Sequence, residues 1–280
     1  MRRNYRLRKV LGDVACYLAL GLIMIFMLGP LIWILLTSVQ PMENLMSVPP
    51  RVSVANATLK YYNDLFADSG FVNALRNTIV ITIMTTAFSI LVAVPGAYAV
   101  ARFPLRRKNM FMFAILGLQL GPAIVFLIPL FVMVRNMGLI DTRTGVVLVL
   151  SAFVIPMAVW LLRGFFENIP KGLELAARMD GCSRLGAFIR IIIPLARGGI
   201  IAIVVSLFIS IWGEFLVPLI LTFSRASTLT IYASAFGGLH NVNYGGAAAV
   251  AVLCGLPSSI LAVALRRHLV SGLLQGSIKG

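Results

Sequence analysis

Long hydrophobic runs dominate this chain and are separated by shorter polar segments. Each run is continuous rather than alternating, and about 20 apolar residues in a helix are enough to cross a bilayer. Because lipid offers no partners to free backbone groups, the runs are expected to be helices. The pattern predicts six spans, at about 14–38, 77–101, 109–134, 144–162, 198–221 and 245–265.

The expected fold is an all-α integral membrane protein, with residues 1–280 forming a single transmembrane domain. Composition agrees, because charged residues make up only 12% of the chain and hydrophobic residues 60%, whereas a soluble domain carries about 25% charged residues. The first run is too long for the apolar region of a signal peptide, and the segment after it is a poor cleavage site. This run is therefore expected to stay as a membrane anchor.

The net charge of +15 indicates membrane orientation rather than a nucleic-acid partner. With the N-terminus inside, 18 of the 24 Lys and Arg residues fall in the cytoplasmic segments 1–13, 102–108, 163–197 and 266–280. Short cytoplasmic loops accumulate basic residues, and these are attracted to anionic lipid head groups. Both termini are therefore expected to lie in the cytoplasm.

The spans offer little to catalysis or ion coupling. The chain has no Gly-x-x-x-x-Gly-Lys-Ser/Thr loop, so it is not expected to bind ATP in that way. Glu214 is the only charged residue inside the six predicted spans, which leaves an ion-coupled carrier little to work with. The three cysteines have no metal-ligand spacing. We expect no catalytic residue, metal site or cofactor in this chain, and an energy source in a partner.

The predicted inner loop at about 163–197 carries the most informative pattern. Pro170 is suited to starting a helix, and Gly181 permits the left-handed turn that ends one. Four residues between them recur at helical spacing and leave a face of small side chains: Leu173, Ala176, Ala177 and Asp180. A short cytoplasmic helix of this kind fits a groove on a soluble partner.

This loop resembles the EAA loop of ABC importer permeases, where Glu-Ala-Ala is followed by three residues, Gly, and later an apolar residue and Pro. Four residues match in type and spacing: Ala176, Ala177, Gly181 and Pro194. The chain departs from the pattern at Leu175, which stands directly before the alanines. The acid lies one position earlier, at Glu174, and this leaves the identity of the acidic contact open.

Other segments resemble the carbohydrate (maltose-type, binding-protein-dependent) branch of that family. Asn77-Thr78-Ile79 opens the second span, and the stretches 97–103, 212–219 and 272–280 follow that branch's patterns in the right order. The resemblance implies a type I ABC importer permease fold. It also implies ATP-driven import of a di- or oligosaccharide-like solute across the bacterial or archaeal cytoplasmic membrane.

The resemblance further implies three protein partners: a second, different permease subunit, a dimer of ATPase subunits that bind ATP and Mg, and an extracytoplasmic solute-binding protein. The inner-loop helix is expected to dock on an ATPase through Leu173, Glu174, Ala176, Ala177, Arg178, Met179, Asp180, Gly181 and Pro194. Alternatively, the two acids cap this helix or pair with Arg178 and Arg184. The tail residues Gln275 and Lys279 are expected to reach the ATPase dimer, with a frayed terminus as the alternative.

The residues expected along the substrate path are Gln119, Trp212, Glu214 and Phe215. A carboxylate within a span is costly unless it faces a partner, a cavity or the bundle interior, and sugars need polar acceptors beside aromatic faces. Glu214 therefore either lines the path or makes a structural hydrogen bond to a neighbouring helix. Gln119 either faces the path or belongs to a close helix–helix contact beside Gly117 and Gly121.

Two alternatives remain for the function. A permease for a polyol or glycerol phosphate is the nearest, but a phosphate ligand would favour cations in the pathway, and the predicted spans contain none. A stand-alone secondary transporter belongs to a different class, and the inner-loop motif and the missing charge network argue against it. A membrane-embedded enzyme would need paired catalytic groups, which no predicted span holds.

Overall fold

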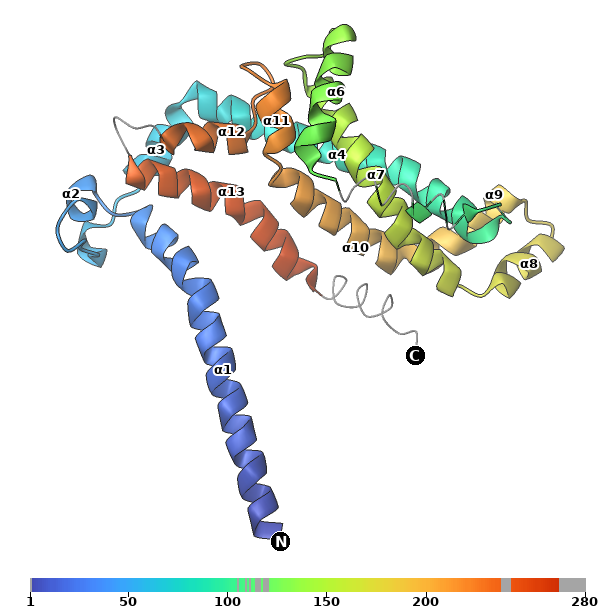
Figure 1. Ribbon diagram of the computed structural model, residues 1–280, viewed down its shortest axis with the longest axis horizontal. Coiled ribbons are helices and arrows are strands. Elements are labelled where there is room, and N and C mark those ends of the chain that lie inside the picture. Colours follow the sequence, from blue (N-terminus) through green and yellow to red (C-terminus); the bar gives the residue numbers. More distant parts are fainter. Residues whose placement is uncertain are drawn as a thin grey trace. The chain divides into compact units, whose positions relative to one another are not determined.

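The computed structural model describes residues 2–104, 106–108, 110, 112–113, 117, 121–237 and 243–266. Every regular element in this part of the chain is helical (Figure 1). The chain divides into two compact units. The first comprises the chain up to Asp68 together with Ala235–Leu253, and the second comprises Ser69–Ser234 together with the chain from Cys254 onward.

Five helices in the described residues are long and apolar enough to cross a membrane. They are Gly12–Thr37 within α1 (Arg2–Thr37), α4 (Ser69–Arg102), α7 (Arg143–Asn168), the continuous helix Arg184–Trp212, and α13 (Tyr244–Ala264). These coincide with the first, second, fourth, fifth and sixth predicted spans. Much of the third predicted span lies outside the described residues, and α6 (Ala123–Asn136) covers its second half.

The first unit contains α1, α2 (Met42–Leu45), η1 (Val54–Asn56), α3 (Lys60–Ala67), η3 (Ala235–Gly237) and the first part of α13. The buried Gln40 side chain orders the segment after α1, because its amide donates to the Ser53 carbonyl at 3.1 Å and accepts from the Ser53 N–H at 3.0 Å. The Tyr61 ring packs so closely on Gly245 that a Cβ there would clash. The segment between the first two predicted spans therefore contains three short helices, and its last residues, from Ser69 on, belong to α4.

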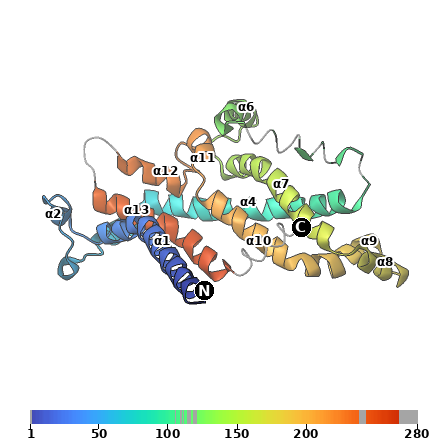
Figure 2. The ribbon, with the colours of Figure 1, turned by 60° about the horizontal axis from the view of Figure 1, so that its bottom comes forward.

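The second unit is a bundle in which α4 and α7 make the most extensive contact and α10 (Ile193–Trp212) packs on both. Figures 1 and 2 show these three helices side by side. Small residues permit this close approach, since Ala97 of α4 and Ala158 of α7 are both fully buried. Two short helices complete the unit: α12 (Leu229–Ser234) packs on α4, and α11 (Leu216–Leu221) packs on α6 and α7.

The inner loop is more helical than the sequence predicted. Helix α7 continues to Asn168, α8 covers Lys171–Met179, and α9 (Arg184–Ala187) runs through the π-helical turn η2 (Phe188–Ile192) into α10. Pro194 has no N–H to donate to the carbonyl four residues earlier, and the π-turn directly before it changes the hydrogen-bond register. Only residues 169–170 and 180–183 of the predicted loop are non-helical.

The fifth span, predicted as one helix over 198–221, is interrupted at residues 213–215. Gly213 is the C-cap of α10, and the Glu214 carboxylate accepts hydrogen bonds from the N–H groups of Leu216 at 2.9 Å and Val217 at 3.3 Å. These N–H groups belong to the first turn of α11 and have no partner within that helix. Pro218 has no N–H and therefore needs no acceptor there. The prediction of a continuous helix is wrong at this point.

Candidate functional site

Helix α8 begins and ends where the sequence indicates. Pro170 is its N-cap, and Gly181 has a φ of 86°, which places it in the left-handed region that glycine adopts most readily. The N–H of Gly181 donates to the Arg178 carbonyl at 3.2 Å, and the N–H of Cys182 donates to the Ala177 carbonyl at 2.9 Å. These two bonds form a Schellman motif. The predicted left-handed turn at Gly181 is confirmed.

Glu174 holds α8 against the last turns of α4. The Tyr98 hydroxyl donates to Glu174 Oε1 at 2.6 Å, and Arg102 Nε lies 3.3 Å from Glu174 Oε2 in an ion pair. The side chains of Arg102 and Glu174 are 6% and 14% exposed, so the pair is largely buried. Arg102 Nη2 also donates to the Ile169 carbonyl just after α7, at 2.9 Å. We call Glu174, Tyr98 and Arg102 the Glu174 clasp.

This clasp answers the question that the sequence left open about Glu174. Its partner is Arg102, 72 residues earlier in the chain, and not Arg178 or Arg184. Asp180 is the C-cap residue of α8, and its side chain is exposed.

An aromatic cluster lies beneath the Glu174 clasp. The Tyr98 ring contacts Phe103, Phe166 and Phe188, with ring centroids 6.4, 6.1 and 4.4 Å apart. These rings come from the residues after α4, from α7 and from η2. The elements that surround α8 are therefore packed together through large apolar side chains, which gives the helix a firm base.

The outward face of α8 is apolar. Leu173, Leu175 and Met179 are 45%, 58% and 88% exposed, and Ala176 is exposed as well. Ala177 is only 7% exposed, so of the two alanines Ala176 is the open one, and the docking role of Ala177 stays a prediction. A solvated helix with several large exposed apolar side chains is typical of an interaction surface. Arg178 is exposed, and Pro194 lies in the first turn of α10, outside α8.

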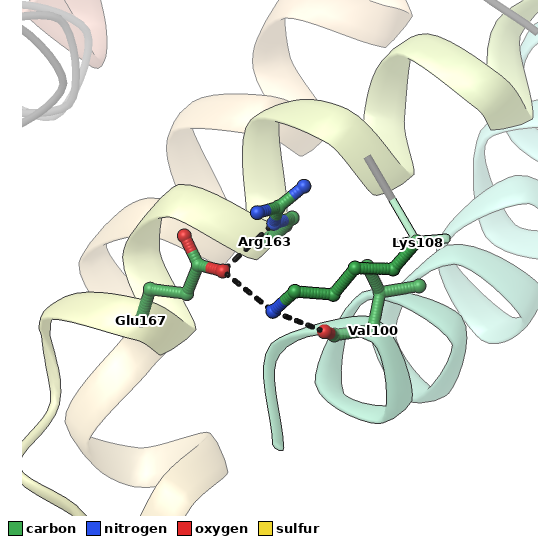
Figure 3. Close-up of polar contacts among 4 residues, drawn as sticks. All are labelled: Val100, Lys108, Arg163 and Glu167. Atoms are coloured by element: carbon green, nitrogen blue, oxygen red, sulfur yellow. Dashed lines mark hydrogen bonds and ion pairs between the residues drawn. The ribbon is translucent and has the colours of Figure 1, made fainter. Parts of the chain in front are cut away.

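A second ionic cluster joins the segment after α4 to α7 (Figure 3). Glu167 Oε1 lies 2.8 Å from Arg163 Nε and 3.6 Å from Lys108 Nζ, and Lys108 donates to the Val100 carbonyl at 3.4 Å. The side chains of Lys108 and Glu167 are about one third exposed. The spacing of Arg163 and Glu167, four apart on one helix, signals the first half of this cluster in the sequence.

One of the predicted substrate-path residues lines a cavity. This cavity, of about 190 Å³, is walled by residues of α6, α7, α10 and α11 and by Glu214, and Ser210 is the other polar residue among the described residues of its lining. The carboxylate of Glu214 also caps α11, as described above. Glu214 therefore combines a structural hydrogen bond, made to its own backbone neighbours rather than to another helix, with a place at the cavity.

The other predicted path residues are placed differently. Trp212 is 5% exposed, its indole Nε1–H donates to the Cys254 carbonyl at 2.8 Å, and its ring stacks on Phe208 with centroids 5.7 Å apart. Phe215 is half-buried and does not line the cavity. Gln119, Gln275 and Lys279 lie outside the described residues. No group of three or more His, Cys, Asp or Glu side chains that could hold a metal ion occurs within the described residues.

A carboxylate clasp that the sequence did not predict is built on Asp141, which adopts a φ of 54° between α6 and α7. Its carboxylate accepts hydrogen bonds of 3.0–3.3 Å from four successive backbone N–H groups, those of Phe223, Ser224, Arg225 and Ala226. Burial raises the pKa of Asp141, but these hydrogen bonds lower it by a larger amount. The pKa of Asp141 therefore lies well below its usual range. We call this arrangement the Asp141 clasp.

Two residues of α4 reinforce the Asp141 clasp. The Asn77 amide donates to the carbonyls of Arg225 at 3.0 Å and Ser227 at 2.8 Å, and its oxygen accepts from Arg143 Nε at 2.7 Å. Thr78 Oγ1 accepts from the N–H of Leu229 at 2.8 Å. The segment between α11 and α12 is thus bound to the first part of α4 and the first turn of α7. The Asn-Thr pair that opens the second predicted span was its only sequence signal.

Comparisons with known proteins agree with this architecture. The family model described as binding-protein-dependent transport system inner membrane component matches residues 86–275. A trehalose transport system permease protein of Mycobacterium tuberculosis is 32% identical, with 91% of this chain and 93% of that protein covered.

Two solved structures have the same fold. A chain from a bacterial ABC transporter involved in import of the acidic polysaccharide alginate aligns with a TM-score of 0.79 and 25% identity, over 92% of this chain and 96% of that one. A chain from a bacterial alginate ABC transporter, in complex with an alginate pentasaccharide-bound periplasmic protein, aligns with a TM-score of 0.70 and 16% identity, over 93% and 94%.

Proposed function

Because the chain belongs to the family of binding-protein-dependent transport system inner membrane components, we propose that it forms half of the pathway of an ATP-driven importer for a neutral di- or oligosaccharide. The chain is a sugar-importer permease subunit and not an enzyme. The observation that carries the proposal is the exposure of one apolar face of α8. The opposite face of this helix is held against α4 by the Glu174 clasp.

The coupling role belongs to α8. Leu175 and Met179 lie four residues apart on one face and are mostly exposed, so they suit a groove on the ATPase subunit. Helix α8 also contacts α9 and η2, which continue into α10. A displacement of α8 by closing ATPase subunits would therefore reach α4 through the Glu174 clasp and α10 through its contacts with η2. Two arrangements of the bundle, biased by the ATPase and the loaded binding protein, would give alternating access.

The proposed topology has six crossings of the bacterial or archaeal cytoplasmic membrane. Both termini would lie on its cytoplasmic side. Five long apolar helices and α6, at the end of the third predicted span, support this number. The concentration of basic residues in the four proposed inner segments supports the orientation. In this orientation α8 lies in the cytoplasm and the Asp141 clasp lies on the outer side.

A second, different permease subunit is the proposed partner within the membrane. Within its own unit, and among the described residues, the apolar stretch Gly12–Thr37 has no buried residue. Gly12, Gly21 and Gly29 have open space where a side chain would be, which would permit close approach of another helix. Lipid and the second permease would share this surface. A solute-binding protein is the proposed partner outside, by analogy with the alginate transporter complex.

The proposed substrate class follows from the cavity at Glu214. The described residues of its lining carry one carboxylate, one hydroxyl and the aromatic ring of Phe153, but no cation. Hydroxyl groups of a neutral saccharide can donate to such a carboxylate, whereas a phosphate or an acidic sugar would be repelled by it. A neutral saccharide is favoured over a glycerol phosphate for this reason, and one relative at 32% identity is named for trehalose.

The test is uptake of labelled sugar by proteoliposomes that contain this chain, the second permease, the ATPase subunits and the binding protein. Met179→Asp should abolish ATP-dependent uptake and ATPase association, because it places a charge on the apolar docking face. Met137→Asp is the matched control, since Met137 is 62% exposed at the end of α6, far from α8 in the sequence. Uphill transport by this chain without its partners would contradict the proposal.

A further inference from the structure

A basic cavity of about 190 Å³ lies beside the docking face of α8. It is lined by residues of the last turn of α4, the two residues that follow, α8 and the start of α9. Among the described residues of its lining, four side chains are cations, Arg102, Lys171, Arg178 and Arg184, and one is an acid, Glu174. Such a density of positive charge needs an explanation, because like charges repel one another.

The one acid in the lining does not neutralise this charge. Glu174 already accepts a hydrogen bond from Tyr98 and pairs with Arg102. Arg102 is itself incompletely satisfied, because its Nη1 is buried and has no hydrogen-bond partner among the residues that the structure describes. A buried guanidinium nitrogen without an acceptor is costly, so the positive charge of Arg102 is incompletely compensated at the wall of this cavity.

The remaining cations are arranged around the opening. The Arg184 guanidinium lies over the Phe103 ring, 5.4 Å from its centroid, and such a cation–π contact restrains it. Lys171 and Arg178 are seven residues apart and therefore lie on the same face of α8. Leu175, which lies between them, lines the cavity and is 58% exposed, so the cavity is continuous with the apolar docking face.

We infer that this cavity receives a carboxylate side chain from the ATPase subunit that docks on α8, an inference that rests on the proposed function. Arginine matches a carboxylate with paired N–H groups, so several arginines at one opening favour an Asp or Glu. Continuity with the docking face favours a protein side chain over a free anion. In the EAA pattern the permease carries an acid at the position that Leu175 occupies in this chain. Here the permease instead supplies the cations, and the ATPase supplies the acid.

The experiment measures the dissociation constant of the ATPase subunit for the two-permease complex in nanodiscs of neutral phosphatidylcholine. Arg178→Glu and Arg184→Glu should each weaken binding by about tenfold or more, and should reduce its dependence on salt. Arg178→Lys should keep most of the affinity. Arg190→Glu is the matched control, since Arg190 is an exposed arginine of η2 that does not line the cavity, and it should bind like the wild type.

A charge-swap variant separates a direct contact from a folding defect. Replacing the ATPase acid that contacts the cavity by Lys should weaken binding to the wild-type permease and restore binding to Arg178→Glu. Restoration by the swap requires that the variant permease is folded and that the two charges meet. A swap series in which no acidic position of the ATPase restores binding would overturn the inference.

The outcomes distinguish this inference from the proposed function. If the wild-type complex binds no ATPase, the proposed function fails, and the inference fails with it. If the wild type binds and transports but both charge reversals bind as tightly as Arg190→Glu, only the inference is overturned. The inference is also overturned if inorganic phosphate binds to the same arginines while their replacement leaves the affinity for the ATPase unchanged. It is likewise overturned if the charge reversals weaken binding only when the nanodisc contains phosphatidylglycerol.

Discussion

Two carboxylate clasps hold segments against opposite parts of α4, and they are built differently. The Asp141 clasp uses four backbone N–H groups together with Asn77 and Thr78, near the start of the helix. The Glu174 clasp uses the side chains of Tyr98 and Arg102, at its end. Asn77 and Arg102 are 25 positions apart in one helix, which separates the two clasps by a helical rise of about 37 Å.

The difference indicates which end of the bundle is built to stay fixed. Backbone N–H groups cannot turn away from a carboxylate unless the whole segment moves, so the Asp141 clasp resists opening. Side chains can change rotamer while their helices stay intact, so the Glu174 clasp can adjust when α8 is displaced. In the proposed orientation, a fixed outer segment and an adjustable inner helix would suit a bundle that is moved from its cytoplasmic side.

The largest expected effect comes from breaking the Glu174 clasp. Glu174→Ala leaves the Arg102 guanidinium buried and unpaired, and should destabilise the bundle by about 3–5 kcal/mol. Proteolysis and thermal unfolding of the purified complex would measure this. Replacing both Arg102 and Glu174 by Met should recover most of the stability, because the uncompensated charge disappears.

A matched control exists on α7. Glu167→Ala removes a carboxylate that pairs with Arg163 and Lys108 but is about one third exposed, so it should cost no more than about 1 kcal/mol. Equal losses for Glu167→Ala and Glu174→Ala would contradict the distinction between a buried clasp and a surface pair.

The next effect is expected at Asp141. Asp141→Ala removes the acceptor of four backbone N–H groups and should cost about 1–3 kcal/mol, with faster hydrogen exchange confined to residues 223–226. Asp141→Asn should cost less, because its amide oxygen still accepts and Asn tolerates the positive φ of this position. Uptake should fall less for Asp141→Asn than for Glu174→Ala if the outer segment serves only as a fixed support.

A smaller effect on stability is expected at Gly181, where no atom lies within 4 Å of an added Cβ but φ is positive. Gly181→Val should cost about 1–2 kcal/mol through its backbone conformation, and should uncouple ATP hydrolysis from uptake because α8 loses its end. Gly172→Val is the control, since Gly172 also has open space and lies within α8. Normal coupled transport by Gly181→Val would exclude the proposed role of this turn.

The smallest effect is a pH dependence of the Asp141 clasp. Because the folded pKa of Asp141 lies below its unfolded value of about 3.9, its contribution to stability is present above that value. It is lost only as the pH falls through the lower, folded value. Protection factors of the N–H groups at 223–226 should therefore stay constant from about pH 7 to pH 4. A loss of protection centred near pH 5 would show that the carboxylate is not held in this way.

Much of the fold is local and was predicted. The long apolar runs predicted five of the observed spanning helices, and Pro170 and Gly181 predicted the limits of α8 to within a residue. The break at residues 213–215 was missed, because hydropathy treats Glu214 as one polar residue within a long apolar run. Its carboxylate caps a second helix, which depends on backbone geometry that hydropathy does not contain.

The sequence by itself determined the membrane class, the approximate positions of five spans, the inner-loop helix and the family, since these depend on runs, spacings and motifs along the chain. Tertiary structure alone decided that Glu174 turns to Arg102 rather than to the nearby Arg178 or Arg184, and that Asp141 binds a segment more than 80 residues away. Such pairings depend on which helix ends meet after packing. A carboxylate has the same charge toward every cation and every N–H, so only the packed backbone selects its partner.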